Sequence, residues 1–273
     1  MKPAKKSIGV FDSGFGGLNT LRSIVKALPQ YNYIYLGDSA QAPYGNRSPG
    51  EVYKFTRQAV DFLFRNNCEL VVLACNTASS EALRKIQQEY LPKHYPGRRV
   101  LGVLIPAAEL AAVKKHKRVG IMATTGTVKS GAFKRELTKL KRDIEVYQQG
   151  CPLLVPIVEA GKENTKQTKI VLQNYLHPLL KQNIDVLILG CTHYGILKKQ
   201  INRLVGNKVK IISEADIVPK KLAEYLRRHK KIANKISLNR AVQFYSTGQI
   251  NKFEKLGSKF FGKKIRAQKA ILQ

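Results

Sequence analysis

The chain has 273 residues, and its 48 Lys and Arg against 18 Asp and Glu give a formal net charge of +30 at pH 7. A hydrophobic fraction of 44% argues against wholesale disorder, and the apolar runs fall short of the roughly 18 residues that would span a membrane. Four cysteines are too few for a disulfide scaffold, and the basic start leads into no secretory signal. These features predict a soluble, cytoplasmic protein with reduced thiols.

Short runs of β-branched and aliphatic residues alternate with longer amphipathic segments along the chain. The runs predict strands at Ile8–Phe11, Tyr33–Leu36, Leu70–Ala74, Val100–Leu104, Arg118–Met122, Val186–Leu189 and Val209–Ile212. Between them, segments such as Glu51–Asn66 carry apolar side chains at helical spacing. Continuous apolar runs suit strands buried on both faces, and strands alternating with helices indicate an α/β class with parallel sheets.

Two turn-like segments, His94–Gly97 and Val205–Lys208, are the best candidate domain boundaries. They predict a discontinuous first α/β domain, residues 1–97 plus 208–273, and a second α/β domain, residues 98–207.

A repeated pattern, a buried strand that leads into a cysteine, suggests that the two domains are alike. The strand Leu70–Ala74 runs directly into Cys75, and Val186–Leu189 leads through Gly190 into Cys191. Ligands of open α/β sheets bind just beyond the carboxyl ends of the strands. We therefore expect two similar domains with mainly parallel central sheets and an active site in the cleft between them.

The glycine-rich segment Asp12–Gly17 follows the first predicted strand. A dinucleotide-binding GxGxxG pattern would need a glycine at Asn19, so the segment does not match it, and a Walker A pattern is absent. A carboxylate, a hydroxyl and flexible backbone at a strand end suit a small molecule that carries both charges, such as an amino acid. The alternative is a tight strand-to-helix turn with a capping Asp.

Cys75 and Cys191 are the sharper signal. A thiol between a strand end and a helix N-terminus is expected to have a lowered pKa. The sequence has no CxxC, HxxxH or HExxH pattern, which argues against disulfide exchange and a metal site, while Cys68 and Cys151 fit buried structural thiols. Two thiols in matched surroundings suit stereoinversion at a carbon, where one group removes a proton and the other returns one on the opposite face.

Four motifs together resemble the glutamate racemases of the aspartate/glutamate racemase superfamily. They are Asp12–Gly17, Gly37–Ser39 with Pro43–Gly45, Ala74–Ser79 and Gly190–Tyr194, in the family's order and at its usual spacing. The resemblance extends through Ser246–Gly248 and the amphipathic segment Phe253–Phe261. Aspartate racemases usually carry Glu after Cys-Thr in the second cysteine motif, so His193 points to glutamate.

The resemblance implies a cofactor-independent isomerase, without pyridoxal phosphate or metal, that interconverts L- and D-glutamate and supplies D-glutamate for peptidoglycan biosynthesis. Cys75 would exchange the Cα proton of D-glutamate and Cys191 that of L-glutamate. Asp12 and His193 would assist the two thiols, with Glu159 near the histidine. The residues that would contact substrate are Asp12, Ser13, Tyr44, Gly45, Asn76, Thr77, Thr124, Thr127, Thr192 and His193, with Thr125 a weaker candidate.

The resemblance also implies a homodimer, and two rival functions stay open. One is racemisation of another acidic amino acid. The other is nucleic-acid binding on a retained scaffold, since Lys and Arg neutralise phosphates. The excess charge fits a solvated basic face better, because no dedicated nucleic-acid module is recognisable. His94, His116, His177 and His229 are expected at the surface.

Overall fold

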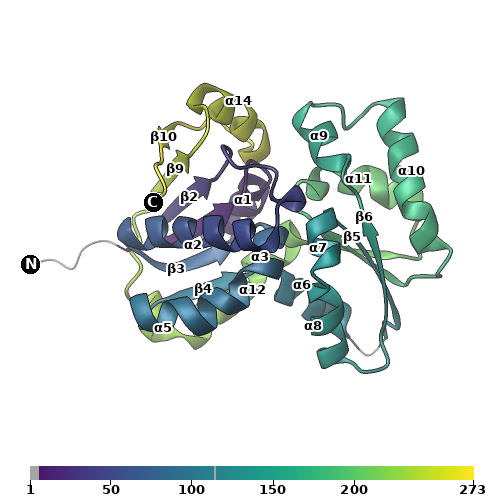
Figure 1. Ribbon diagram of the computed structural model, residues 1–273, viewed down its shortest axis with the longest axis horizontal. Helices are drawn as coiled ribbons and strands as arrows, with labels where there is room; N and C mark the ends of the chain where they lie inside the picture. The colour runs from purple at the N-terminus through teal and green to yellow at the C-terminus, as the bar shows by residue number, and fades with distance from the viewer. Residues whose placement is uncertain (1–5, 114) are drawn as a thin grey trace, which may run out of the picture.

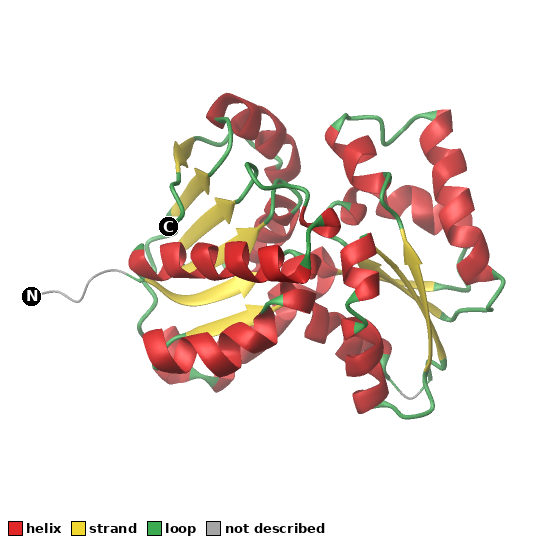
Figure 2. Ribbon diagram, viewed as in Figure 1, coloured by secondary structure: helices red, strands yellow, loops and turns green. Residues whose placement is uncertain are grey.

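The computed structural model describes residues 6–113 and 115–273, which form two α/β domains side by side (Figures 1 and 2). The first domain holds a six-stranded sheet in the order β10-β9-β2-β1-β3-β4, and every pairing in it is parallel. Its strands are β1 (Ser7–Asp12), β2 (Tyr33–Gly37), β3 (Cys68–Leu73), β4 (Arg99–Gly102), β9 (Val242–Ser246) and β10 (Ala267–Lys269).

The second domain holds a four-stranded parallel sheet in the order β6-β5-β7-β8. Its strands are β5 (Arg118–Ala123), β6 (Glu145–Gly150), β7 (Val186–Gly190) and β8 (Lys210–Ser213). The α/β class with two parallel sheets is therefore confirmed.

Helices cover both faces of the first sheet. One layer holds α1 (Gly17–Ala27), α12 (Glu214–Arg228) and α14 (Ile250–Phe261), and α1 packs against both others. The opposite layer holds α2 (Pro49–Arg65), which crosses the near face of the sheet in Figure 1. The remaining helical segments of this domain are η1 (Tyr44–Asn46), α3 (Asn76–Glu81), α4 (Leu83–Lys85), η2 (Ile86–Tyr90), α5 (Leu91–His94) and α13 (Lys230–Ala233).

Helix α2 illustrates how sequence fixes these layers. Ser48 and Glu51 form a capping box at its start, which satisfies two otherwise unpaired backbone N–H groups. Val52, Val60 and Leu63 lie one and two turns apart on its buried face. Burial of such side chains stabilises the fold by about 1.5–3 kcal/mol each, so Leu63→Ala would cost about 2–5 kcal/mol.

The second domain surrounds its sheet with α6 (Leu104–Ala111), α7 (Thr125–Lys129), α8 (Ala132–Leu140), α9 (Leu154–Glu159), α10 (Lys166–Leu180) and α11 (Tyr194–Val205).

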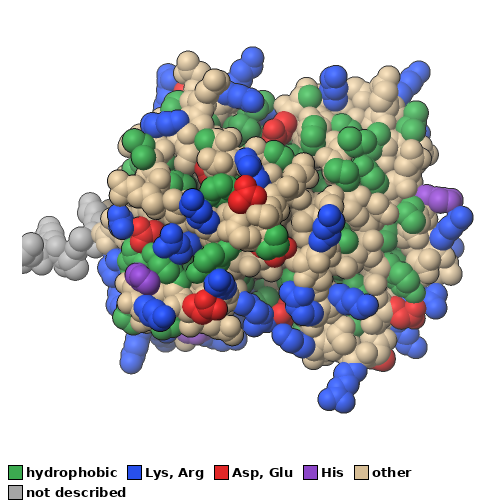
Figure 3. All heavy atoms as spheres, in the orientation of Figure 1, with side chains coloured by type: hydrophobic (Ala, Val, Ile, Leu, Met, Phe, Trp, Pro, Cys, Tyr) green, Lys and Arg blue, Asp and Glu red, His purple; other side chains and the backbone are tan. Residues whose placement is uncertain are grey.

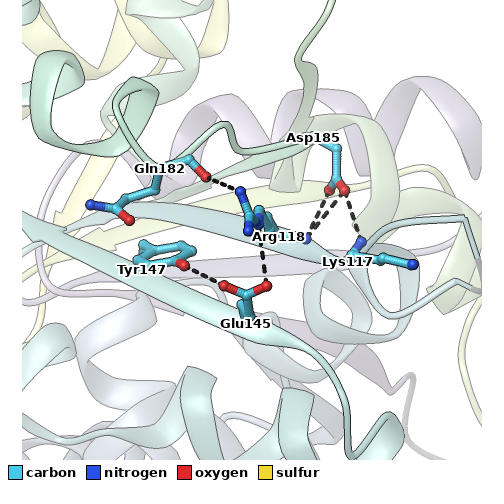
Figure 4. A network of polar contacts seen from close by, with 6 residues as sticks. All are labelled: Lys117, Arg118, Glu145, Tyr147, Gln182 and Asp185. Atoms are coloured by element: carbon cyan, nitrogen blue, oxygen red, sulfur yellow. Dashed lines mark hydrogen bonds and ion pairs between the residues drawn. The ribbon is translucent and has the colours of Figure 1, made fainter.

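A polar network ties the amino ends of this second sheet together (Figure 4). The carboxylate of Asp185 accepts from the backbone N–H of Lys117 at 2.8 Å and of Arg118 at 3.2 Å, and Arg118 also pairs with Glu145 at 3.2 Å. Tyr147 donates its hydroxyl to the same Glu145. The starts of β5, β6 and β7 are thus fixed, and their carboxyl ends face the other domain.

Several details differ from the sequence predictions. Strands β6, β9 and β10 were not predicted. Strand β4 pairs within the first sheet and β8 within the second, each a few residues beyond the boundaries predicted at residues 97/98 and 207/208. The domain limits themselves remain a proposal. His116, expected at the surface, is instead 4% exposed, and its Nδ1 lies 3.1 Å from the Ala111 carbonyl oxygen.

Lys and Arg side chains are spread over both halves of the face seen in Figure 3. None of the helices in the described part of the chain is both long and apolar enough to cross a membrane.

Candidate active site

The carboxyl ends of strands from both sheets meet between the domains. Cys75 lies two residues beyond β3 and caps α3, and Cys191 follows β7 directly. Cys75 is 6% exposed and Cys191 is 7% exposed, and both line one cavity. The structure therefore brings together the two thiols that the repeated pattern singled out, one from each domain.

Most of the predicted site residues line this cavity. They are Ser13, Tyr44, Gly45, Cys75, Asn76, Thr77, Thr124, Glu159, Cys191, Thr192 and His193. Asp12 and Thr127 lie behind them, fully buried, and Thr125 is outside the lining. Gly14, Ala42, Pro43 and Val155 complete the wall. Pro43 belongs to the predicted Pro43–Gly45 motif, whereas Ala42 and Val155 were not singled out, because apolar side chains carry no chemical signal in a sequence.

Cys191 faces an imidazole that is itself held by a carboxylate. Its Sγ lies 3.9 Å from Nδ1 of His193, and the Nε2 atom of that ring lies 3.0 Å from Oε1 of Glu159. His193 is buried, whereas the Glu159 side chain is 28% exposed. The acid thus fixes the imidazole beside the thiol from the solvent side.

Asp12, at the end of β1, connects the two domains. Its Oδ2 accepts from the backbone N–H of Gly14 at 2.9 Å, and its Oδ1 accepts from the hydroxyl of Thr192 at 3.2 Å. Burial raises the pKa of this carboxyl above its usual value, although His193 and the hydrogen bonds oppose the shift. The negative charge of Asp12 acts on Cys75 by raising the pKa of its thiol.

The expectation of lowered thiol pKa values is wrong for this closed form of the site. Burial, with a smaller effect of the Asp12 charge, raises the pKa of Cys75 to about 11, although Ser13 lies 3.5 Å from its sulfur. Burial likewise raises the pKa of Cys191 well above its usual value, although the backbone N–H of His193 opposes this. The amides at the helix starts act in the predicted direction, but desolvation is the larger effect.

Three threonine hydroxyls join across the cleft. Oγ1 of Thr77, on α3, lies 3.0 Å from Thr124 and 3.3 Å from Thr127, both of the second domain. Thr124 caps α7 by accepting from the backbone N–H of Thr127. Gly45 packs so closely here that a Cβ at this position would lie 2.7 Å from the Cβ of Thr124.

Two buried acids behind the site were not given a role from the sequence. Asp38 accepts from the Tyr44 hydroxyl at 2.7 Å and from Thr247 at 2.6 Å, so it fixes the aromatic ring that lines the cavity. The sequence feature that pointed to Asp38 was the Gly37–Ser39 motif. Glu214, the first residue of α12, accepts from the Asn76 side chain, and no sequence motif pointed to it.

The cavity between the thiols is narrow, with a volume of about 30 Å³. A wider hollow of about 580 Å³ adjoins it and shares Ala42, Pro43, Val155 and Glu159 with it. These four residues form the wall between the cavity and the outside.

The cavity lining contains no Lys and no Arg, and all of its residues belong to the described part of the chain. It therefore offers no amine for a Schiff base with pyridoxal phosphate. Among residues 6–113 and 115–273, no three His, Cys, Asp or Glu side chains are grouped to hold a metal ion. A reaction without cofactor stays a prediction.

Comparisons with known proteins give consistent results. The sequence profile of the family described as Asp/Glu/Hydantoin racemase matches residues 8–220. The glutamate racemase of Oceanobacillus iheyensis is 39% identical over 260 residues, which are 94% of this chain and 92% of that protein. The glutamate racemase of Bacillus cereus is 38% identical over 267 residues, 97% of each chain.

Solved structures of glutamate racemases also resemble this chain. A glutamate racemase isoform from Bacillus anthracis superposes with a TM-score of 0.89 at 34% identity, over 98% of each chain. The glutamate racemase of Francisella tularensis, solved in complex with D-glutamate, gives a TM-score of 0.88 at 32% identity, also over 98% of each chain. An aspartate racemase from Picrophilus torridus, at 16% identity and a TM-score of 0.54, shares the fold alone.

Proposed function

Because the chain belongs to the Asp/Glu/Hydantoin racemase family, and within it to the glutamate racemases, we propose that it interconverts L- and D-glutamate with Cys75 and Cys191 as the two acid/base residues. The observation that carries this proposal is the placement of both thiols, one from each domain, on the wall of a single cavity. It is an amino-acid racemase with a small-molecule substrate.

The reaction is a proton transfer at Cα in two steps. With L-glutamate, the Cys191 thiolate takes the Cα proton and becomes a thiol, which leaves a carbanion. The Cys75 thiol then gives its proton to the opposite face and becomes a thiolate, so the product is D-glutamate. With D-glutamate the roles reverse. The enzyme ends each turnover with its two sulfur protonation states exchanged, and proton exchange with water restores them.

Raised thiol pKa values suit the difficulty of this proton transfer. A thiolate with a high pKa is a stronger base toward the weakly acidic Cα–H, but it is scarce at neutral pH. Since no Lys or Arg lines the cavity, the ammonium group of the substrate is the cation that would favour the thiolate. Ionisation of the first thiol is thus coupled to substrate binding.

Neutral donors are left to hold the two carboxylates of glutamate. The hydroxyls of Ser13, Thr77, Thr124 and Thr192 and the Asn76 amide line the cavity with such donors. Fixed dipoles of this kind stabilise charge that develops at the carbanion once water is excluded. The residual cavity of about 30 Å³ supports a cycle in which the domains open, admit substrate and close again.

Incubation with L-glutamate in D₂O tests the function directly. The protein is freed of metal and given no pyridoxal phosphate, and optical rotation and Cα deuterium are followed together. We expect rotation to decay to zero as deuterium enters Cα. Absence of exchange at Cα would contradict the proposal. Faster turnover of aspartate than of glutamate would assign the protein to the other acidic substrate.

The proposal extends to the enzyme's setting. D-Glutamate made in the cytoplasm would enter peptidoglycan, and depletion of the protein should then be relieved by D-glutamate in the medium. The homodimer implied by the family resemblance is tested by light scattering of the purified protein. Persistent D-glutamate dependence would support the pathway, and a monomeric mass would contradict the dimer.

A further inference from the structure

Glu214 is a buried acid beside the proposed racemase site, and the two-thiol reaction makes no use of it. It is the first residue of α12, directly after β8, where the chain passes from the second domain back to the first. Glu214 is 4% exposed. Its Oε1 accepts a hydrogen bond from Nδ2 of Asn76, a cavity-lining residue at the start of α3. The pair therefore joins the crossover segment to the helix that follows Cys75.

The pair leaves two buried atoms without partners. Oε2 of Glu214 and Oδ1 of Asn76 both lack a hydrogen-bond partner among the described residues. An ionised carboxylate only accepts hydrogen bonds, so it cannot pair with the amide oxygen. A protonated carboxyl carries one O–H donor, which is what the Asn76 oxygen requires. A proton on the Glu214 carboxyl would supply that donor.

The charges around Glu214 favour the same state. Among the described residues no Lys, Arg or His forms an ion pair with it, and the ionisable groups that face it are Asp12 at the end of β1 and Cys191 at the end of β7. The N-terminus of α12 favours a negative charge by about 0.3–2 kcal/mol. Burial of an unpaired carboxylate costs several kcal/mol, so desolvation is the larger effect. Burial accordingly raises the pKa of Glu214 well above its usual range.

We propose that Glu214 is a positioning residue that stays a neutral carboxylic acid and holds the Asn76 amide in its substrate-binding orientation through a pair of hydrogen bonds. The pair uses one N–H and the oxygen of the amide, so the second N–H of Asn76 is left for a substrate carboxylate. This inference rests on the proposed function for the identity of the substrate, but the protonation state of the pair does not depend on it.

Two substitutions at this position separate the alternatives. Gln in Glu214→Gln can place an N–H where a neutral carboxyl has its O–H, and it keeps a carbonyl acceptor, whereas Met in Glu214→Met keeps the length and offers neither. The matched control is Asp216→Asn, two residues further along α12, where the acid is half exposed and paired with Lys198 at 2.6 Å.

The first readout is infrared difference spectroscopy of the unliganded full chain at neutral pH. We expect the carbonyl band of a protonated carboxylic acid in the wild type, its loss in Glu214→Gln and its retention in Asp216→Asn. An unchanged band in Glu214→Gln would show that Glu214 is ionised and would overturn the proposal. This readout holds even if the protein does not act on glutamate.

The second readout is the kinetics of racemisation. We expect Glu214→Gln to keep the wild-type KM for glutamate within about twofold and the wild-type pH profile of kcat/KM, because one neutral group replaces another. Glu214→Met should raise KM about tenfold, since the Asn76 amide loses its partner. A Glu214→Gln profile shifted to lower pH would mean that a negative charge had been removed beside Cys191, and the proposal would fail. If Glu214→Met does not fold, the pH profile of kcat/KM for Glu214→Gln and the infrared carbonyl band still test the proposal.

Discussion

The imidazole of His193 lies between a carboxylate and a thiol. Oε1 of Glu159 is 3.0 Å from its Nε2, and the sulfur of Cys191 is 3.9 Å from its Nδ1. We expect Glu159→Gln to lower kcat about tenfold, because a neutral amide oxygen holds the ring less strongly than the charged carboxylate does. The partial exposure of Glu159, 28% of its side chain, keeps this effect modest.

The direction of the Glu159→Gln defect is informative. L- and D-glutamate have equal free energies, so kcat/KM must stay equal in both directions in every variant. A defect on the Cys191 side should therefore appear as a larger primary isotope effect with α-deuterated L-glutamate than with the D-enantiomer. Equal isotope effects in both directions would contradict an assisting role for His193 and Glu159 at Cys191.

Single replacement of either active-site thiol should nearly abolish racemisation. Ser is almost isosteric with Cys but a far weaker acid, so Cys75→Ser and Cys191→Ser should each lose at least about 10³-fold in kcat, within the range of general acid–base catalysis. Circular dichroism of glutamate solutions measures the rate.

The control for the thiol variants is Cys151→Ala. Cys151 is fully buried in the second domain, outside the cavity lining, and its Sγ lies 3.4 Å from the Gln149 carbonyl oxygen. This variant should lower the melting temperature and leave kcat near the wild-type value. Near-normal activity of Cys75→Ser or Cys191→Ser would refute the two-thiol mechanism.

A methyl group at Gly16 should obstruct the closed site. A Cβ there would lie 2.6 Å from Nδ1 of His193 and against the Thr192 hydroxyl, both on the other domain. We expect Gly16→Ala to lower kcat/KM by up to about 10²-fold, because catalytic groups are sensitive to displacements near 1 Å. Gly97→Ala is the control, since a Cβ at Gly97 would meet nothing within 4 Å. Equal activity of the two variants would show that the domains do not close to this contact.

The raised thiol pKa values predict how activity depends on pH. Burial raises the pKa of Cys75 to about 11 and that of Cys191 well above its usual value, so the free enzyme holds little thiolate at pH 7. We expect kcat/KM to rise up to about tenfold per pH unit between pH 7 and 9. A flat profile above pH 7 would mean that one thiolate is already formed there.

Stability should show the opposite dependence on pH. Burial raises the pKa of all four thiols, so each folded-state pKa exceeds its unfolded value of about 8.5. Their contribution to the free energy of unfolding is fully present below pH 8.5 and is lost as pH rises through the folded-state values. Thermal melts from pH 8 to 11 should show a falling melting temperature, with a shallower fall in Cys151→Ala. Equal slopes in the two proteins would contradict this.

The predictable part of the fold was the part with buried strands. The seven predicted runs all correspond to strands. Five of these strands, namely β1, β2, β3, β5 and β7, are buried along almost their whole length and are therefore continuously apolar. Strand β6 escaped because its side chains are half-buried and polar, and β10 because it is a three-residue edge strand. Two strand pairings, β3 with β4 and β7 with β8, cross the predicted domain boundaries. The boundaries were predicted from turn residues, and turn residues do not show which strands pair.

The site was predictable where chemistry sits directly after a strand. Cys75, Thr124 and Cys191 each follow a strand end, and the structure places all three on the cavity wall. Glu214 was not predictable, because an acid after Ser213 at a helix start has an ordinary explanation in the helix dipole. Its partner Asn76 lies 138 residues away in the sequence, and only the folded chain brings the two together.

The chain passes between the two sheets twice, after β4 at Gly102 and after β8 at Ser213, and the residues that follow these crossings pack together where α6 meets α12. Two adjacent tethers form a hinge, which would limit the relative motion of the domains to rotation about one axis. A rotation of this kind would bring each sulfur atom to the substrate from the same side at every closure. Strict inversion at Cα is, in this sense, a property of the hinge as much as of the thiols.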